Sequence, residues 1–466
     1  MKRNLFLLTV LTAALLGGCT LAPEYTRPAA PVPVQWPTGE AYGDAASTSS
    51  TAADLPWREV FTDQRLQQVI SIALANNRDL RLAALNVERA WAYYGIQRAE
   101  LFPTVNAVGS GSKSRVPADL SSTGSAMTSE RYDVNLGVSS WEIDFFGRIR
   151  SLKDRALEEY LATDQARRSA QISLISAVAN TYLTLAADRE ALKLVASTLE
   201  TQESSYRMIR KLQDVGLASD VDLRQAQSQV DVARGDVARY TQLAALDENA
   251  LNLLVGSPLP PALLPADLES VRPPKEIDPG LSSEVILRRP DVLAAEHLLR
   301  AANANIGAAR AAFFPRIALT AAIGTASADL SGLFKGGSGT WAFSPQIVMP
   351  IFDARTWSAY DVTKADREIS VTQYEKAIQA AFREVADALA VRGTVDRRIA
   401  AQQSLIEAVA EAYRLSNARY TRGIDSYLGV LDAQRALYAA QQGLIMLHLV
   451  RLANRVTLYS VLGGGA

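Results

Sequence analysis

The sequence contains two copies of one unit, and an internal repeat constrains a fold more than any local propensity does. Leu101–Pro103 returns as Phe313–Pro315, at an offset of 212 residues (103 to 315). Downstream the offset is 207 residues, in these pairs: Asp144–Arg148 with Ile351–Arg355, Gly216 with Gly423, and Gly256 with Gly463. The difference of five residues is absorbed between the two motifs, so the rest of each copy keeps its register.

Each copy predicts the same order of elements: an opening helix, a β-hairpin, a long helix and a return helix. The first copy covers residues 57–256, with a hairpin at about 104–143 and coiled-coil helices at about 148–255. The second covers residues 282–466, with a hairpin at about 316–351 and helices at about 355–462. Residues 257–281 form a Pro-rich linker between them. The fold class expected is therefore α+β with two tandem repeats.

The helical segments carry an apolar seam of nearly seven-residue period, which is typical of coiled-coil packing between neighbours. The seam of the first return helix follows 4-3-4-3-4 spacing: Ala226, Val230, Ala233, Val237, Tyr240 and Ala244. An ordinary helical bundle would show similar seams, so the seams alone leave both arrangements open.

The hairpin segments alternate apolar and polar residues, as in Tyr132, Val134, Leu136 and Val138. Period two with one apolar face, over about ten residues, matches strands of an outer-membrane barrel. A core sandwich is the alternative. Four strands cannot close a barrel, because bacterial barrels begin at about eight. We therefore expect oligomerisation, and three copies would give about 12 strands.

The N-terminus predicts an exported lipoprotein. Residues 1–18 have the basic start and apolar centre of a signal peptide. Cys19, the only cysteine, follows small residues at a lipobox position, and Thr20 after it favours the outer membrane. Residues 19–56 form a Pro-rich tether, expected to be extended and poorly packed. After Cys19 we expect no apolar stretch of about 18 residues, so a membrane would be crossed only by strands.

The composition argues against several other classes of function. The net charge of −1 gives no basic surplus for nucleic-acid binding. No Cys/His cluster, nucleophile elbow or carboxylate pair stands out, so we expect no enzyme activity, no metal and no cofactor beyond the lipid on Cys19. His297 and His448 each stand alone on helices and are expected to be structural.

Several motifs together resemble one known family, the outer-membrane efflux lipoproteins of resistance–nodulation–division (RND) pumps. These are TolC-like channels, here of the OprM, OprJ and CusC type within the NodT group. The resemblance covers essentially the whole mature chain. The motifs that carry it are Asn76–Leu80, Ile143–Arg148, Asn305–Pro315, Tyr427–Leu428, Leu431–Arg435 and Leu462–Gly465.

The resemblance implies a homotrimer with a 12-stranded barrel in the outer membrane, continuous with a periplasmic α-helical barrel. It implies a passive exit duct for drugs or other small toxic compounds. The expected partners are a periplasmic adaptor, an inner-membrane RND transporter and outer-membrane lipid, and no nucleic acid. The two helix turns would be the adaptor-docking tips, with residues Val215, Gly216, Leu217, Ala218, Ser219, Gly423, Ile424, Asp425 and Ser426.

The resemblance also implies a periplasmic gate near the second turn, made by Tyr420, Leu428, Asp432 and Arg435. Independently of it, Gly216 and Gly423 suit helix ends, and Ser219 and Ser426 suit N-caps. Two other functions stay open from the residues: a type I secretion duct of the same architecture, and a periplasmic structural coiled-coil lipoprotein without a pore. Apolar alternating hairpins disfavour the latter, because a spacer does not need them.

Overall fold

The computed structural model describes residues 20–42, 55–277 and 282–464. The predicted signal peptide, Cys19 and the last two residues lie outside this part of the chain. Within it, contacts define two compact units. The first unit takes residues 20–29, 86–163 and 295–374, and the second takes 30–42, 55–85, 164–277, 282–294 and 375–464. Each unit therefore draws segments from both sequence repeats.

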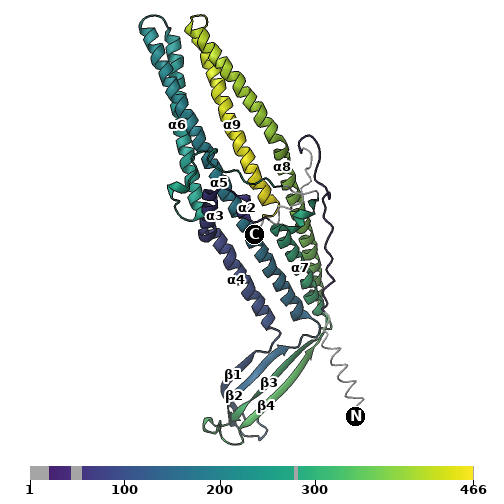
Figure 1. Cartoon of the computed structure of the whole chain (residues 1–466). Coiled ribbons are helices and arrows are strands. Elements are labelled where there is room, and N and C mark those ends of the chain that lie inside the picture. The colour runs from purple at the N-terminus through teal and green to yellow at the C-terminus, as the bar shows by residue number, and fades with distance from the viewer. Residues whose placement is uncertain (1–19, 43–54, 278–281, 465–466) are drawn as a thin grey trace. The chain divides into compact units, whose positions relative to one another are not determined.

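The order of elements follows the predicted pattern (Figure 1). The first half contains α2 (Trp57–Val60), α3 (Gln64–Asn76), α4 (Arg78–Ala99), β1 (Val105–Val116), β2 (Met127–Glu142), α5 (Arg148–Asp214) and α6 (Asp220–Val255). The second half contains α7 (Pro290–Ala311), β3 (Arg316–Ser327), β4 (Gly339–Val348), α8 (Ala354–Thr421) and α9 (Tyr427–Val461). Short 3-10 turns, η2 (Pro261–Leu263) and η3 (Ser283–Arg288), lie in and after the linker, and η4 (Leu330–Gly332) lies between β3 and β4.

The first half has one helix that the sequence pattern did not predict, α3, and Asn77 separates it from the opening helix α4. This residue has extended backbone geometry, with φ −60° and ψ 131°. Its side-chain oxygen accepts a hydrogen bond from the Leu80 backbone nitrogen at 2.8 Å. Asn77 thus ends α3 and caps α4, as a short polar side chain can.

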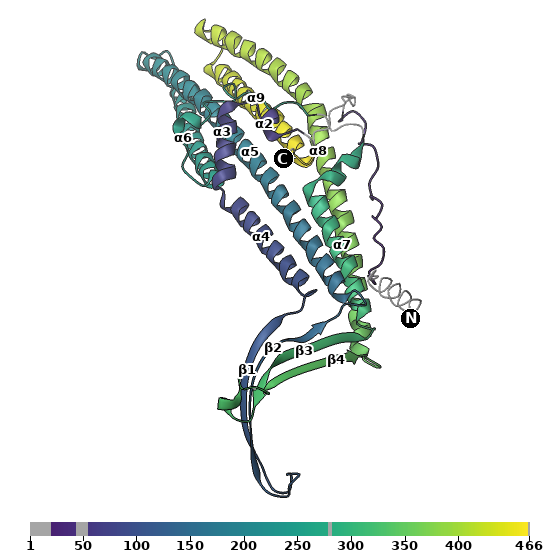
Figure 2. The same cartoon turned by 60° about the horizontal axis from the view of Figure 1, so that its bottom comes forward.

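The four strands form one antiparallel sheet in the first unit, in the order β1-β2-β3-β4. Figure 2 shows the two hairpins side by side in this sheet. The central pairing joins the two sequence repeats, since Leu136 of β2 lies opposite Ile323 of β3. A register shift falls between Val138 and Trp141, where Ser140 has φ 55° and its nitrogen donates to Thr320 Oγ1 at 3.1 Å. Such a bulge bends a strand.

The second unit buries the helical seams that the sequence predicts. Ala226, Val230 and Ala233 of α6 are buried, and Ala179 and Tyr182 of α5 have no exposed surface. Alanine at these positions allows helix axes to approach closely. The seam residues nearer the end of α6, such as Val237, are only partly buried.

One expectation about membrane segments needs correction. A window within α5 meets the length and composition of a membrane-spanning helix, contrary to the expectation that no such stretch follows Cys19. However, 61% of this window is buried inside the protein. A core helix passes the same test, so the window is weak evidence for a membrane span.

The Pro-rich segment 20–42 is extended as expected and none of its residues is buried, but its backbone is held by hydrogen bonds that the sequence did not predict. In the first unit, Asn303 Nδ2 donates a hydrogen bond to the Pro23 carbonyl at 2.8 Å. In the second unit, the Ser283 nitrogen donates to the Val34 carbonyl at 2.8 Å. Proline lacks a donor but keeps its carbonyl as an acceptor, so an extended Pro-rich chain can still be held.

Candidate functional site

The two helix turns in the second unit share one hydrogen-bonding pattern. In the first turn the Leu217 nitrogen donates to the Leu212 carbonyl at 2.8 Å, and Gly216 donates to Gln213 at 2.9 Å. The second turn repeats this 207 residues later, with Ile424 donating to Arg419 at 3.0 Å and Gly423 to Tyr420 at 2.8 Å. Gly216 and Gly423 have φ values of 77° and 71°, which favour glycine. Both turns are therefore Schellman caps, as their glycines predict.

The serines that follow the turns behave differently. Ser219 and Asp222 form a complete capping box at the start of α6, with the Asp222 nitrogen donating to Ser219 Oγ at 3.1 Å. Ser426 occupies the N-cap position of α9, but its side chain makes no capping hydrogen bond. The third helical residue here is Gly429, which cannot return a capping-box bond as Asp222 does. The expected cap at Ser426 is thus correct in position and wrong in its side-chain bond.

The turns present apolar side chains to solvent. Val215, Leu217 and Ile424 have 68%, 76% and 57% of their surface exposed. Beside them Arg419 Nη2 donates to Asp425 Oδ1 at 3.0 Å, and hydrogen bonding to Arg419 lowers the pKa of Asp425. Exposed apolar groups next to an ordered ion pair are suited to contact another protein.

The predicted gate residues on α9 lie together on a solvent-exposed side of the helix. Leu428, Asp432 and Arg435 are all exposed, at spacings of four and three residues. Arg435 Nη1 lies 3.4 Å from Asp432 Oδ1. The Nε of Arg435 also donates to Gln229 Oε1 on α6, at 3.0 Å. Arg435 therefore bridges Asp432 on its own helix, α9, and Gln229 on the neighbouring helix, α6.

Tyr420, the fourth predicted gate residue, is placed differently. Its ring packs against Tyr427, with centroids 5.1 Å apart, and joins an apolar cluster with Ile209, Ala226 and Leu431. Burial is the main reason that the pKa of Tyr420 is raised. Tyr420 thus supports the turn from within, while the three α9 residues face outward.

Polar contacts that the sequence did not predict continue between α6 and α9, C-terminal to Arg435 on α9. Tyr438 Oη donates to Asp236 Oδ2 at 3.1 Å. Gln442 Nε2 donates to Tyr240 Oη at 3.1 Å and to Tyr438 Oη at 2.7 Å. The signal was available, since Tyr438 and Gln442 are four residues apart on one helix face. Their partners could not be identified without the register between the two helices.

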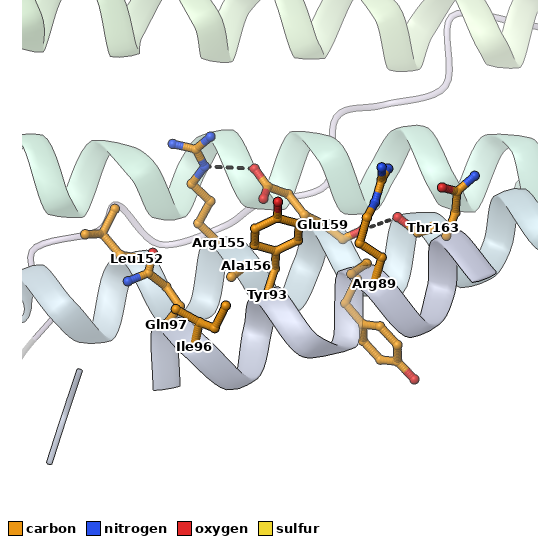
Figure 3. Close-up of a pocket in the computed structure, with 12 residues that line it drawn as sticks. Arg89, Tyr93, Ile96, Gln97, Leu152, Arg155, Ala156, Glu159 and Thr163 are labelled. Atoms are coloured by element: carbon orange, nitrogen blue, oxygen red, sulfur yellow. Dashed lines mark hydrogen bonds and ion pairs between the residues drawn. The ribbon is translucent and has the colours of Figure 1, made fainter. Parts of the chain in front are cut away.

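A groove of about 640 Å³ lies in the first unit, between α4 and α5 (Figure 3). Its lining mixes aromatic and charged residues, including Tyr93, Arg89 and Glu159. Arg155 Nε donates to Glu159 Oε1 at 2.8 Å within it. No group of three or more potential metal ligands occurs among the residues that the structure describes. One of the two histidines, His297, instead pairs its Nδ1 with Glu158 Oε2 at 2.6 Å.

Comparison with known proteins places the chain in a family. The family profile described as "Outer membrane efflux protein" matches residues 69–257 and 281–464, one match in each sequence repeat. The toluene efflux pump outer membrane protein TtgC of Pseudomonas putida is 50% identical over 100% of this chain and 96% of its own length. The outer membrane protein OprJ of Pseudomonas aeruginosa is 42% identical, over 100% and 97% of the two chains.

Solved structures agree with this assignment. The structure of the open state of the MtrE outer membrane channel of Neisseria gonorrhoeae superposes with a TM-score of 0.86. It has 39% sequence identity and covers 96% of this chain and 98% of its own. The family resemblance predicted from the sequence motifs is confirmed, and these relatives are named as channels and efflux-pump components. The chain therefore belongs to the outer membrane efflux protein family.

Proposed function

We propose that this chain is the exit duct of a tripartite RND-type pump, conducting small toxic compounds passively from an adaptor and transporter to the exterior. Membership of the outer membrane efflux family places it in the outer membrane of a Gram-negative bacterium. The relative named for toluene efflux supports small organic compounds as substrates. Passive conduction fits relatives and solved structures that are named as efflux-pump outer membrane proteins and as an outer membrane channel.

The sheet supports closure by three copies into one barrel. Within the described chain, β1 pairs with β2 and β4 pairs with β3, so the sheet has two open edges. An open edge in lipid leaves backbone groups unsatisfied, at a cost of about several kcal/mol each. Three tandem-repeat chains of four strands each would close an even-numbered barrel of about 12 strands. The long coiled-coil helices α5 and α8 would continue it as an α-helical barrel.

The lipid anchor is part of the proposal. Cys19 would carry the thioether-linked lipid, because it is the only cysteine and stands at a lipobox position. Residues 20–42 would then be the start of a mature, anchored chain. Cleavage after residue 18 removes the basic n-region with the signal peptide.

The two turns would form the adaptor-docking tips. Their Schellman geometry is the same in both repeats, and their exposed side chains, such as Leu217 and Ile424, offer apolar contacts. A helical hairpin of the adaptor could pack against such a surface through apolar anchors.

The gate would lie on α9, in the first turns after the second tip. A three-fold assembly repeats Leu428, Asp432 and Arg435 around its axis, giving an apolar ring next to a charged ring. The 3.0 Å bond from Arg435 to Gln229 supports a closed arrangement, because it ties α9 to α6. An exposed ion pair contributes only about 0–1 kcal/mol, so several pairs are needed to bias a two-state closure.

Single-channel recording in planar bilayers tests this proposal. Wild-type protein should form channels, and Asp432→Ala combined with Leu428→Ala should raise their conductance about twofold or more without changing trimer content, because it removes the apolar ring and the acidic part of the charged ring. The repeat supplies the control: Val221 and Gln225 occupy the equivalent positions on α6. Changing both to alanine should leave conductance as in wild type.

Two outcomes would count against the proposal. Correctly assembled trimers of the Asp432/Leu428 variant with wild-type conductance would move the gate elsewhere along the helices. A folded wild-type protein that never conducts would favour the periplasmic spacer instead of the duct.

A further inference from the structure

In the first unit, residues 20–27, which we name the clasp segment, lie along α7 and touch the first turn of α5 (Figure 2). Thr20 Oγ1 lies 3.2 Å from Ser151 Oγ of α5. The Leu21 carbonyl accepts from Arg310 Nη1 at 3.1 Å, and the Pro23 carbonyl accepts from Asn303 Nδ2 at 2.8 Å. Asn303 and Arg310 are two helical turns apart, so α7 holds the segment at successive positions.

A buried carboxylate fixes the other end of the clasp segment. The Glu296 side chain is only 3% exposed and accepts from Arg27 Nε at 3.1 Å, Tyr25 Oη at 3.1 Å and Arg300 Nη2 at 2.7 Å. Burial alone would raise the pKa of Glu296, but hydrogen bonds from Arg27 and Arg300 outweigh it, so the pKa is lowered. An ionised, buried carboxylate requires such donors, and the clasp segment supplies two of its three donor residues.

Gly307 leaves room for the backbone of the clasp segment. A Cβ atom at Gly307 would lie 2.7 Å from the Ala22 nitrogen and 2.5 Å from Ser151 Oγ. Glycine inside a helix costs roughly 0.5–1 kcal/mol relative to alanine, so a close backbone approach gives it a reason to be there. The surface of α7 therefore complements the clasp segment in shape, at Gly307, and in charge, at Glu296.

We infer that α7, with Ser151, is a built receptor for the clasp segment, and that the clasp fixes the start of the mature chain beside the sheet. What the clasp segment does for the membrane anchor rests on the proposed lipid on Cys19, whereas its docking on α7 does not. Ser151 lies just after the start of α5, shortly downstream of the end of β2. Docking therefore fixes Thr20, the residue that follows the proposed lipid site in the sequence, near the start of α5.

Release of the clasp would give the anchor a long reach. The segment is held again at Pro33, whose carbonyl accepts from Ser283 Oγ at 2.6 Å. An extended chain from there to residue 20 spans roughly 45 Å at about 3.5 Å per residue. A docked clasp segment would therefore fix the distance between the lipid and the strands, whereas a released segment would let that distance vary.

Limited proteolysis of detergent-solubilised, full-length protein tests the inference. Glutamyl endopeptidase can cut after Glu24, which is exposed, and the new N-terminus at Tyr25 identifies the product. Arg27→Gln should accelerate this cut about tenfold or more, because it removes charge-assisted bonds to Glu296. Gly307→Ala with Ser151→Ala should do the same, because this variant removes the Thr20–Ser151 contact and places a Cβ atom against the Ala22 backbone.

The control is Arg355→Gln, which alters an exposed arginine of the same unit that pairs with Asp353. It should be cut at the wild-type rate, and all variants should keep wild-type helix content by circular dichroism. Wild-type cleavage rates in both clasp variants would overturn the inference. Accelerated cleavage in a protein that takes up no palmitate would leave the clasp standing and instead reject the proposed lipid on Cys19.

Discussion

At the scale of single residues, an unusual feature of the second unit is a pair of aspartates on neighbouring helices. Asp188 of α5 faces Asp247 of α6, and Oδ2 of Asp247 is buried without a donor partner. Burial, followed by the charge of Asp188, raises the pKa of Asp247 to about 6. Asp188 also has a raised pKa, chiefly through burial. A proton shared between the two carboxyl groups would satisfy the buried oxygen.

This pair predicts a pH-dependent stability. A carboxyl group with a raised pKa in the folded state stabilises the fold most below its unfolded pKa, and this contribution is lost as pH rises through about 6. Asp247→Asn does not titrate and can donate to Asp188. We expect it to raise the free energy of unfolding by about 1 kcal/mol at pH 7.5, a value discounted for solvent screening. The gain should vanish below about pH 4.

Thermal unfolding followed by circular dichroism across this pH range measures the effect. Asp231→Asn is the matched control, because Asp231 lies on the same helix, is exposed and pairs with Arg234 at 3.5 Å. It should change stability by less than about 0.5 kcal/mol. A loss of stability for Asp247→Asn at pH 7.5, or a gain independent of pH, would contradict the shared-proton interpretation.

At the scale of elements, the tips depend on the left-handed glycines. Replacing Gly216 or Gly423 by alanine forces a Cβ into a positive-φ position, at a cost of about 1–2 kcal/mol. We expect faster amide exchange in the last turns of α5 and α8 and weaker adaptor binding. Gly235→Ala in α6 is the control, and its effect should have the opposite sign. The new Cβ would meet nothing within 4 Å, so the change should stabilise the helix by roughly 0.5–1 kcal/mol. Equal effects at tip and control would contradict the cap assignment.

Elements were predictable where the sequence carries local chemistry. Gly216 and Gly256 end helices in the left-handed conformation, and the apolar seam of α6 is buried where its period predicts. Helix α3 was not predicted, because the role of Asn77 as the residue that ends it is ambiguous until its side chain finds a partner. The Arg27–Glu296 pair joins residues 269 apart, and no local pattern contains that information. In the candidate site, the tip turns were predictable. The bond between Arg435 and Gln229 was not, because it depends on how α6 and α9 align.

At the scale of the whole molecule, closure of the sheet and anchoring by lipid are separate contributions, and one variant separates them. The open edges of β1 and β4 need partners in lipid, which only other copies can supply in the proposed barrel. The lipid adds membrane affinity but pairs no backbone group.

We therefore expect Cys19→Ser to abolish palmitate labelling while the folded, membrane-extracted protein still runs at three protomers by light scattering. Wild-type protein supplies the comparison for both label and mass. If instead a stable folded monomer is extracted from the membrane, the four-strand argument is wrong, because a single open sheet would then survive in lipid with its edge groups unpaired. If the variant keeps its label, the lipid is carried elsewhere than Cys19, and the clasp would no longer set its height.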